Sequence, residues 1–359
     1  MDKKMRPKNT IPVVFSSDDN YAPYLGVCIK SLIGHSTPFN NYEIFIIDGG
    51  ISKNHKNQIS SMEIKNISIK FIDIKPFLEN IDLSIFSLNS HFTINTYYRF
   101  FMPKIFSNYD KLIYLDCDML ILKDVKELFD IDIDDNYLGV TRDIYVIYSA
   151  AKNNFTQSDY YCKILGLKKH ENYFNAGCMI CNMKKMREDN LTEKLIKKLC
   201  EIKKPKFVDQ CILNAVCHGQ VKYIQNNWNY TWHLSLTKDC STYLPSPYME
   251  YYLSAETEPY IIHFTSGKKP WTDISLPKSY IWWQYARNTP FYEEILYKNF
   301  QQQNIDQVKD VINYNKNRLK YWRYKILSKI TFGKIRKKYK EKKKTFKNKL
   351  YHAGEFLKQ

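Results

Sequence analysis

Two carboxylates interrupt an apolar stretch in the middle of the chain. In the segment KLIYLDCDML, the apolar run LIYL is followed by Asp116 and Asp118, with Cys117 between them. An extended chain places residues two apart on one face, so the two carboxylates would repel each other unless a cation lay between them. Carboxylate oxygens suit Mg²⁺ or Mn²⁺, which keep positions open for phosphate oxygens. By itself, the pair fits an exposed turn equally well.

A third candidate ligand lies near the end of another apolar run, much later in the chain. His263 ends PYIIHF and precedes TSGKKPW, which contains a glycine and two lysines. These are residue types that accept a diphosphate. Lys268 and Lys269 also fit a solvated surface, and a single histidine after a strand is more often structural. Taken with Asp116 and Asp118, however, His263 predicts a metal and phosphate site.

Strands and helices that would position these residues alternate along the chain. Apolar runs predict strands over 11–17, 42–50, 67–74, 111–118, 137–143 and 175–183. Helical periodicity predicts helices over 52–63, 96–106 and 184–202, and another with Tyr24, Val27, Cys28 and Leu32 on one face. Ser52 is the predicted N-cap of the helix that begins there. The alternation predicts an α/β fold of parallel β-α-β units, with helices on both faces of the sheet.

Three of the predicted strands end in polar residues. The first ends in SSDDNY, the fourth in DCD, and a later one in HFTSGKKPW. Ligands of parallel sheets bind outside the carboxyl ends of the strands. Asp and Asn are also ordinary turn residues, so each ending carries little weight alone. Three of them at one edge predict a binding site.

The positive charge is concentrated near the end of the chain. The 359 residues carry a net charge of +17, and residues 301–359 contain 18 Lys and Arg against 4 Asp and Glu, a net of +14. The rest of the chain is therefore nearly balanced, at 17 − 14 = +3. We predict a domain over residues 1–290 and a basic, partly amphipathic helical region over 291–359.

Composition excludes several classes of protein. An apolar fraction of 44% argues against general disorder. The charged start MDKKMRPKNT does not resemble a signal peptide, and no apolar run is long enough to span a bilayer. Nine cysteines with irregular spacing indicate reduced thiols in a cytosolic protein, with Cys178 and Cys181 packed in the core rather than binding zinc. No G-x-G-x-x-G follows the first strand, which disfavours a dinucleotide oxidoreductase.

Five segments occur in an order that resembles glycosyltransferase family 8. They are FSSDDNYAPYLGVCIKSL, YLDCDMLIL, YFNAGCMICNM, VDQCILN and HFTSGKKPW, and the resemblance runs from about residue 11 to 290. This retaining family includes bacterial lipopolysaccharide galactosyl- and glucosyltransferases. The resemblance implies a GT-A fold with a Rossmann-like, mostly parallel central sheet. It also implies transfer of a hexose from a UDP-sugar to a saccharide acceptor.

The resemblance further implies roles for individual residues. Asp116, Asp118 and His263 would hold Mn²⁺ or Mg²⁺, and the diphosphate would complete the coordination shell. The residues that would bind the donor are Asp18, Asp19, Asn20, Tyr21, Arg99, Asp116, Cys117, Asn175, Ala176, Gly177, Gly267 and Lys269. Asp209 and Gln210 would lie beneath the donor sugar as the catalytic residues. Because Gln210 is a neutral amide and a poor nucleophile, we predict same-face attack by the acceptor hydroxyl, with a covalent intermediate on Asp209 as the alternative.

Two positions depart from the family pattern. Many relatives have D-Q-D where this chain has Asp209, Gln210 and Cys211, and the donor loop often has glycine where this chain has Ser266. If Cys211 marks a loss of activity, the alternative function is a UDP-sugar-binding protein with little or no turnover. The sequence does not distinguish galactose from glucose as the donor sugar.

The basic region suggests a partner for the chain. Clustered lysines with interleaved aromatics fit an anionic membrane surface. For an enzyme that extends a lipid-linked saccharide, they predict a cytoplasmic protein attached peripherally to the inner face of the cytoplasmic membrane. Nucleic-acid binding is disfavoured because no recognisable nucleic-acid-binding fold accompanies the lysines, and a disordered solubilising end is the other alternative.

Overall fold

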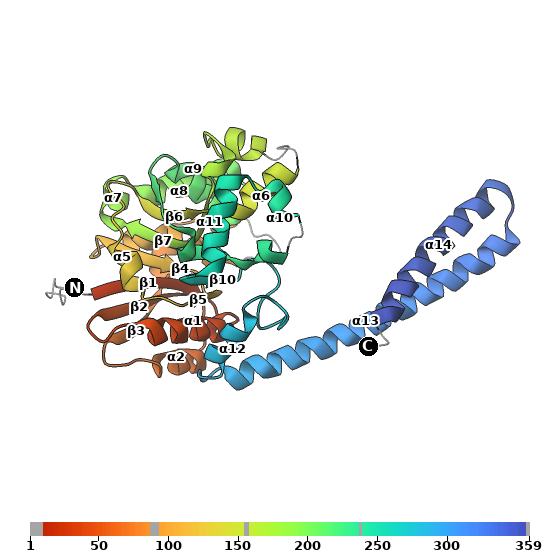
Figure 1. Ribbon diagram of the computed structural model, residues 1–359, viewed down its shortest axis with the longest axis horizontal. Helices are drawn as coiled ribbons and strands as arrows, with labels where there is room; N and C mark the ends of the chain where they lie inside the picture. Colours follow the sequence, from red (N-terminus) through yellow and green to blue (C-terminus); the bar gives the residue numbers. More distant parts are fainter. Residues whose placement is uncertain (1–9, 87–92, 154–157, 237–238, 357–359) are drawn as a thin grey trace. The chain divides into compact units, whose positions relative to one another are not determined.

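The computed structural model describes residues 10–86, 93–153, 158–236 and 239–356 (Figure 1). Two sequence predictions concern residues that lie partly outside these ranges. One is the interpretation of the N-terminal segment, which includes residues 1–9, as unlike a signal peptide; the other is the basic region, which ends at residues 357–359. The chain divides into two compact units, Met1–Tyr292 and Glu293–Gln359.

A seven-stranded sheet forms the centre of the first unit. In spatial order its strands are β3 (Ile67–Asp73), β2 (Asn41–Asp48), β1 (Thr10–Ser17), β4 (Lys111–Leu115), β7 (Phe174–Asn182), β6 (Leu138–Arg142) and β8 (Val221–Tyr223). Neighbouring strands are parallel, except that β7 is antiparallel to both β4 and β6. The predicted α/β fold with a mostly parallel sheet is confirmed.

Both faces of this sheet are buried. Val14 of β1 and Tyr114 of β4 belong to one apolar core together with side chains from the segments at 94–106 and 183–217. Strand alternation turns Val13, Phe15 and Ile113 to the opposite face, where they are also fully buried. Burial on both faces explains why these strands are nearly continuous apolar runs in the sequence.

Helices connect the strands and pack around the sheet (Figure 1). The α-helices of this unit are α1 (Ala22–His35), α2 (Lys53–Ser60), α3 (Lys75–Leu78), α4 (Met102–Ile105), α5 (Val125–Asp130), α6 (Ile144–Lys152), α7 (Met183–Glu188), α8 (Leu191–Ile202), α9 (Val208–Cys217), α10 (Cys240–Tyr243), α11 (Ser246–Thr257) and α12 (Ser279–Ala286). The short 3₁₀ or π turns are η1 (Leu83–Ile85), η2 (Ile94–Phe101), η3 (Tyr160–Ile164), η4 (His170–Asn172), η5 (Asn226–Asn229) and η6 (Trp232–Leu236). Ser52 caps α2 as predicted, since its side chain accepts a hydrogen bond from the backbone N–H of His55.

Two predicted helices differ from those in the structure. The helix predicted over 184–202 is two helices, α7 and α8, because Asn190 adopts a left-handed conformation with φ of 51°. The helix predicted over 96–106 is mostly the 3₁₀ turn η2, and only the four residues of α4 are α-helical. Pro103 lies in the first turn of α4, where its missing N–H has no intrahelical partner to lose.

A second, three-stranded sheet changes the surroundings of the two aspartates. It consists of β5 (Met119–Ile121), β10 (Ile261–His263) and β9 (Tyr230–Thr231). The strand predicted over 111–118 ends at Leu115, and residues 116–118 form the turn that leads from β4 into β5. We predict from the sequence that the strand ending at His263 shares the carboxyl edge of the parallel sheet, but β10 lies in the smaller sheet and pairs antiparallel with β5, with His263 opposite Met119. The site therefore lies where the two sheets meet.

The second unit is built from two helices, α13 (Tyr292–Ile330) and α14 (Gly333–Phe356). The ring of Tyr324 on α13 stacks on Tyr339 and Phe346 of α14, at centroid distances of 6.0 and 5.7 Å. In the parts of the chain that the structure describes, no helix combines the length and the apolar character needed to cross a bilayer. All nine cysteines are free, and Cys178 and Cys181 are buried in β7, in agreement with the prediction.

Candidate active site

The turn between the two sheets holds Asp116 and Asp118 by backbone hydrogen bonds. The N–H of Asp116 donates to the carbonyl of Gly177 on β7 at 2.8 Å, and the carbonyl of Asp118 accepts from the N–H of Phe264 at 2.9 Å. Cys117 points away, with its thiol 3.1 Å from the carbonyl of Ser16. The two carboxylates face one side as predicted, although the segment is a turn and not an extended strand.

His263 joins the two carboxylates at the end of β10. Its Nε2 lies 3.1 Å from Asp118 Oδ1 and 3.8 Å from Asp116 Oδ2. One ligand atom from each of the three residues falls within 4.8 Å of the others. A methyl group on Gly177 would lie 2.3 Å from His263 Cε1 and 2.8 Å from Asp116 Oδ2, so only glycine allows this approach. Two carboxylates and an imidazole are ligands that suit Mn²⁺ or Mg²⁺.

Lys269 brings a positive charge to the same place. Its ammonium lies 2.5 Å from Asp118 Oδ2 and also donates to the carbonyl of Phe264 at 2.6 Å. Burial alone would raise the pKa of Asp118, but Lys269 and His263 hold it well below its ordinary value. Asp118 is therefore ionised and able to bind a cation.

Arg99 connects the candidate metal ligands to the predicted catalytic residues. Its side chain is 6% exposed and lies 2.8 Å from Asp116 Oδ1 and 3.0 Å from Asp209 Oδ2. It also donates to the carbonyl of Ala176 at 2.7 Å and stacks on the ring of Tyr114 at 4.3 Å. The guanidinium of Arg99 is thus held in place by groups of the protein itself.

Asp209 and Gln210 lie side by side at the start of α9 but differ in exposure. Asp209 is 3% exposed; Oδ1 accepts from the hydroxyl of Thr96 and Oδ2 is paired with Arg99. Burial raises the pKa of Asp209 to about 6, with Arg99 opposing the shift. Gln210 is partly exposed, and its amide is oriented by the N–H of Ala176 and by Asp143 Oδ2, both at 3.0 Å. Gln210 reaches the surface of the site and Asp209 does not.

The loop after β1 reaches the site through aromatic contacts. The Asp18 carboxylate accepts from the N–H of Tyr21 at 3.0 Å, and Asn20 is exposed. Asp19 Oδ1 accepts from the N–H of Ser52 and contacts the imidazole of His55, both at 2.7 Å, so it anchors the start of α2. The ring of Tyr21 meets Trp271 edge to face at a centroid distance of 6.3 Å. This contact brings the loop beside the segment that carries Gly267 and Lys269.

Ser266, where the family pattern often has glycine, has a backbone conformation that favours glycine. Its φ is +79°, a conformation that glycine adopts without strain, whereas Gly267 has no positive φ. The positive φ therefore falls at the position where the family pattern often has glycine, although this chain has serine there. Cys211 is buried, and its thiol lies 3.2 Å from the hydroxyl of Tyr173.

Sequence reasoning missed two residues of the site. Asp143 follows β6 and accepts from both Gln210 and Asn175. It ends a predicted strand, so the rule that pointed to the other strand ends would have found it. Asn229 contacts Nδ1 of His263 at 2.9 Å. It lies in a 3₁₀ turn in the segment NNWNY, and no local signal identifies it.

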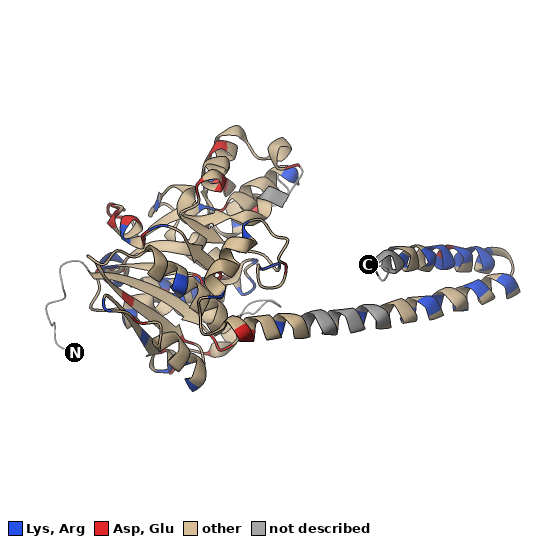
Figure 2. Ribbon diagram, turned by 60° about the horizontal axis from the view of Figure 1, so that its bottom comes forward, with Lys and Arg blue, Asp and Glu red and all other residues tan. Residues whose placement is uncertain are grey.

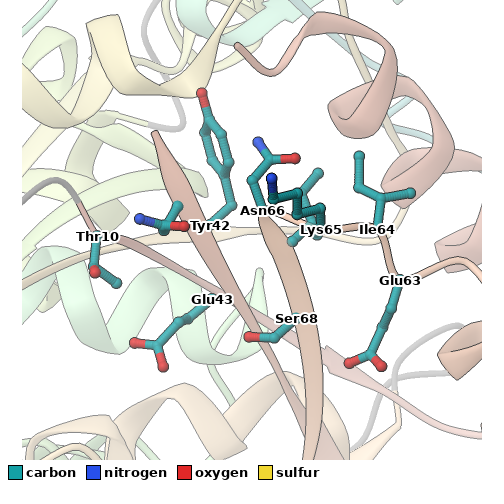
Figure 3. A pocket seen from close by; sticks show the side chains of 10 residues that line it. Thr10, Tyr42, Glu43, Glu63, Ile64, Lys65, Asn66 and Ser68 are labelled. Atoms are coloured by element: carbon teal, nitrogen blue, oxygen red, sulfur yellow. The ribbon is translucent and has the colours of Figure 1, made fainter. Parts of the chain in front are cut away.

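A hollow lies at the edge of the central sheet opposite the carboxyl ends of its parallel strands. Figure 3 shows it at the amino ends of β1, β2 and β3, where Thr10, Tyr42, Glu43 and Ser68 are among the lining residues; its volume is about 330 Å³. Parallel α/β sheets bind ligands at the carboxyl ends of their strands. Its position therefore separates this hollow from the cluster of Asp116, Asp118 and His263.

The fold and the site together define the class of protein. A mostly parallel α/β sheet, followed by a D-x-D turn into a smaller sheet that carries a histidine, is the GT-A arrangement of glycosyltransferases. The chain belongs to glycosyl transferase family 8, whose profile matches residues 12–275. The resemblance noted in the sequence is confirmed.

Relatives in sequence and structure agree with this assignment. General stress protein A of Bacillus subtilis strain 168 is 29% identical over 274 residues, which cover 74% of this chain and 89% of that protein. The lipopolysaccharide 1,2-glucosyltransferase of Escherichia coli is 25% identical over 277 residues, covering 75% and 76%. The galactosyltransferase LgtC, solved with donor and acceptor sugar analogues, superposes with a TM-score of 0.63 at 26% identity, covering 78% and 96%. The bifunctional glycosyltransferase WbbM gives a TM-score of 0.72 at 29% identity, covering 82% of this chain and 53% of WbbM.

Proposed function

We propose that this protein transfers galactose or glucose from a UDP-sugar to a saccharide acceptor with retention of configuration, in a reaction that needs Mn²⁺ or Mg²⁺. The proposal rests on the cluster of Asp116, Asp118 and His263, with Lys269 beside it. Two carboxylates, an imidazole and a lysine form a site that matches a divalent cation and a diphosphate. The similarity to a lipopolysaccharide 1,2-glucosyltransferase and to the galactosyltransferase LgtC, solved with donor and acceptor sugar analogues, supports transfer of a hexose.

Donor binding follows from the residues that surround this cluster. The loop of Asp18, Asn20 and Tyr21 would hold the uridine and ribose, because it borders the site through Trp271. Asn175 and Gly177 would line the sugar pocket from β7. Arg99 is buried, so we assign it the positioning of Asp116 and Asp209 in place of a direct donor contact.

Bond cleavage requires stabilisation of the departing diphosphate. A divalent cation at Asp116, Asp118 and His263 would supply Lewis-acid stabilisation. Lys269 would place a second positive charge against the phosphate oxygens as negative charge develops there. The positive centre that forms at the anomeric carbon needs nearby oxygens, and we assign this role to Gln210.

Retention of configuration is consistent with two routes, and the burial of Asp209 favours one of them. A nucleophile must reach the anomeric carbon, but both oxygens of Asp209 are engaged by Thr96 and Arg99 below the surface. Gln210 reaches the site and is a poor nucleophile. We therefore favour same-face attack by the acceptor hydroxyl, with the leaving phosphate as base. Detection of a glycosylated Asp209 peptide by mass spectrometry would refute this route.

Assays of the full-length chain with UDP-galactose and UDP-glucose test the proposal. We expect Mn²⁺-dependent hydrolysis or transfer of one of them, lost on chelation. Asp118→Ala should remove turnover and metal-dependent UDP binding while leaving the circular dichroism spectrum unchanged. Wild-type binding of a UDP-sugar without any turnover would support the alternative, a UDP-sugar-binding protein. Full activity in chelator would contradict the metal assignment.

We further propose that residues 1–290 form the catalytic domain and that 291–359 attach it to the cytoplasmic face of an anionic membrane. Figure 2 shows Lys and Arg along both helices of this region. Leu319, Trp322, Ile326 and Ile330 are exposed and lie on one face of α13 at helical spacing. Each basic residue near an anionic surface contributes about 1 kcal/mol, and exposed apolar side chains add to binding. Such attachment suits an acceptor that is linked to lipid.

Vesicle co-sedimentation tests the membrane proposal. We expect the full chain to bind vesicles of anionic lipid and the 1–290 truncation to remain in the supernatant. Neutral vesicles serve as the control for charge, and a duplex DNA competitor tests the nucleic-acid alternative. Equal binding by both proteins would contradict a role for residues 291–359 in attachment.

A further inference from the structure

Asn229, at the end of η5, is buried beside His263. Asn229 is 1% exposed and His263 is 4% exposed, and Asn229 Oδ1 lies 2.9 Å from His263 Nδ1. A neutral imidazole carries its proton on one nitrogen, and only the other has a lone pair for a metal. The atom that Asn229 presents to the ring therefore decides which nitrogen can act as a ligand.

A backbone group fixes the orientation of the Asn229 side chain. The N–H of Gly177 can only donate, and it donates to Asn175 Oδ1 at 2.9 Å. The same oxygen lies 2.9 Å from the Asn229 amide, which must therefore present its nitrogen, Nδ2, to it. Asn229 Nδ2 also donates to the hydroxyl of Thr141 at 3.1 Å. The oxygen of Asn229 is then the atom that faces His263.

A second contact supports the same orientation from the other end of Asn175. Its Nδ2 donates to Asp143 Oδ2 at 3.4 Å, and the same oxygen accepts from Gln210 Nε2 at 3.0 Å. With the Asn175 amide reversed, two oxygens would face each other there, and the Gly177 N–H would meet an amide nitrogen. Thr141 is fully buried, and Asn175 is 7% exposed, so water has little access to compensate for such a reversal.

We propose that Asn229 is a positioning residue that holds His263 with its proton on Nδ1, leaving the lone pair of Nε2 directed at Asp116 and Asp118. Nε2 lies 3.1 Å from Asp118 Oδ1, on the side where the cation would bind. Outer hydrogen-bond partners of this kind orient metal-binding histidines and contribute roughly 10- to 100-fold to metal affinity. The inference rests on the proposed metal site.

Side-chain ¹⁵N NMR of the metal-free, full-length protein reads the protonated nitrogen directly. The His263 signal is identified by its absence in His263→Ala. We expect Nδ1 of the wild-type ring to carry a proton, donated to Asn229 Oδ1. Asn229→Leu, which keeps the approximate volume but removes the acceptor, should abolish this preference and weaken Mn²⁺ binding by about 10- to 100-fold in an electron paramagnetic resonance titration.

Thr141→Val is the matched control. It removes one acceptor of Asn229 Nδ2 but leaves Asn175 to set the orientation, so the Nδ1 proton should remain and Mn²⁺ affinity should fall less than in Asn229→Leu. If Asn229→Leu does not fold, the wild-type ¹⁵N spectrum still tests whether Nδ1 carries a proton. A wild-type ring protonated on Nε2 alone, or unchanged Mn²⁺ affinity in folded Asn229→Leu, would overturn the proposal. An Nδ1 proton in a wild-type protein that does not bind Mn²⁺ would refute the metal site and leave the tautomer assignment standing.

Discussion

Gly177→Ala should disable the candidate metal site while preserving the fold. The added Cβ would lie 2.3 Å from His263 Cε1, whereas ordinary contact begins near 3.4 Å, so the imidazole must retreat by 3.4 − 2.3 = 1.1 Å. Metal-ligand distances tolerate only about 0.2 Å. An overpacked site costs about 1–3 kcal/mol. If that cost falls on the bound state, Mn²⁺ affinity drops roughly 5- to 150-fold, since 1.4 kcal/mol corresponds to about tenfold.

Mn²⁺ titration by electron paramagnetic resonance, together with thermal unfolding, separates this effect from general destabilisation. Gly139→Ala is the matched control, because its Cβ would lie 2.7 Å from Ile133 Cγ2 in the core. We expect both variants to unfold at lower temperature and only Gly177→Ala to bind Mn²⁺ weakly. A folded Gly177→Ala protein with wild-type Mn²⁺ affinity would refute the argument that Asp116 and His263 converge on a metal.

Two further substitutions test the supporting structure. Arg99→Leu leaves two buried or partly buried carboxylates without their cation, so it should lower the free energy of unfolding, measured in urea, by about 3–5 kcal/mol. Lys104→Gln is the control: it breaks a half-exposed ion pair with Glu193 and should lower the same free energy by less than about 1 kcal/mol. Equal losses would contradict the buried network. Ser266→Gly should raise the free energy of unfolding by up to about 1 kcal/mol, because relief of the left-handed conformation outweighs the added freedom of the unfolded chain. A destabilised Ser266→Gly protein would show that the serine side chain stabilises the loop.

The order of strands and helices could be read from the sequence because their periodicity is local. The apolar runs at β1, β2, β4, β6 and β7 are largely buried on both faces, so their burial is visible in composition alone, whereas the edge strand β3 alternates buried residues with exposed or half-buried ones. Strand direction is not local, and the antiparallel placement of β7 depends on the path of the chain between β6 and β7. The break at Asn190 was missed because one left-handed residue leaves the amphipathic pattern on either side intact.

For the site, local sequence was enough to identify the residues with the right chemistry: two carboxylates with one residue between them, a histidine after an apolar run, and a lysine six residues after the histidine. The tertiary structure decided that β5 and β10 pair, which brings His263 to the turn of Asp116 and Asp118. It also decided that Asp209 is buried against Arg99 and that Asn229 orients the imidazole. These last features depend on contacts between segments distant in the chain, because hydrogen-bond direction and burial are properties of the packed interior and not of any local stretch.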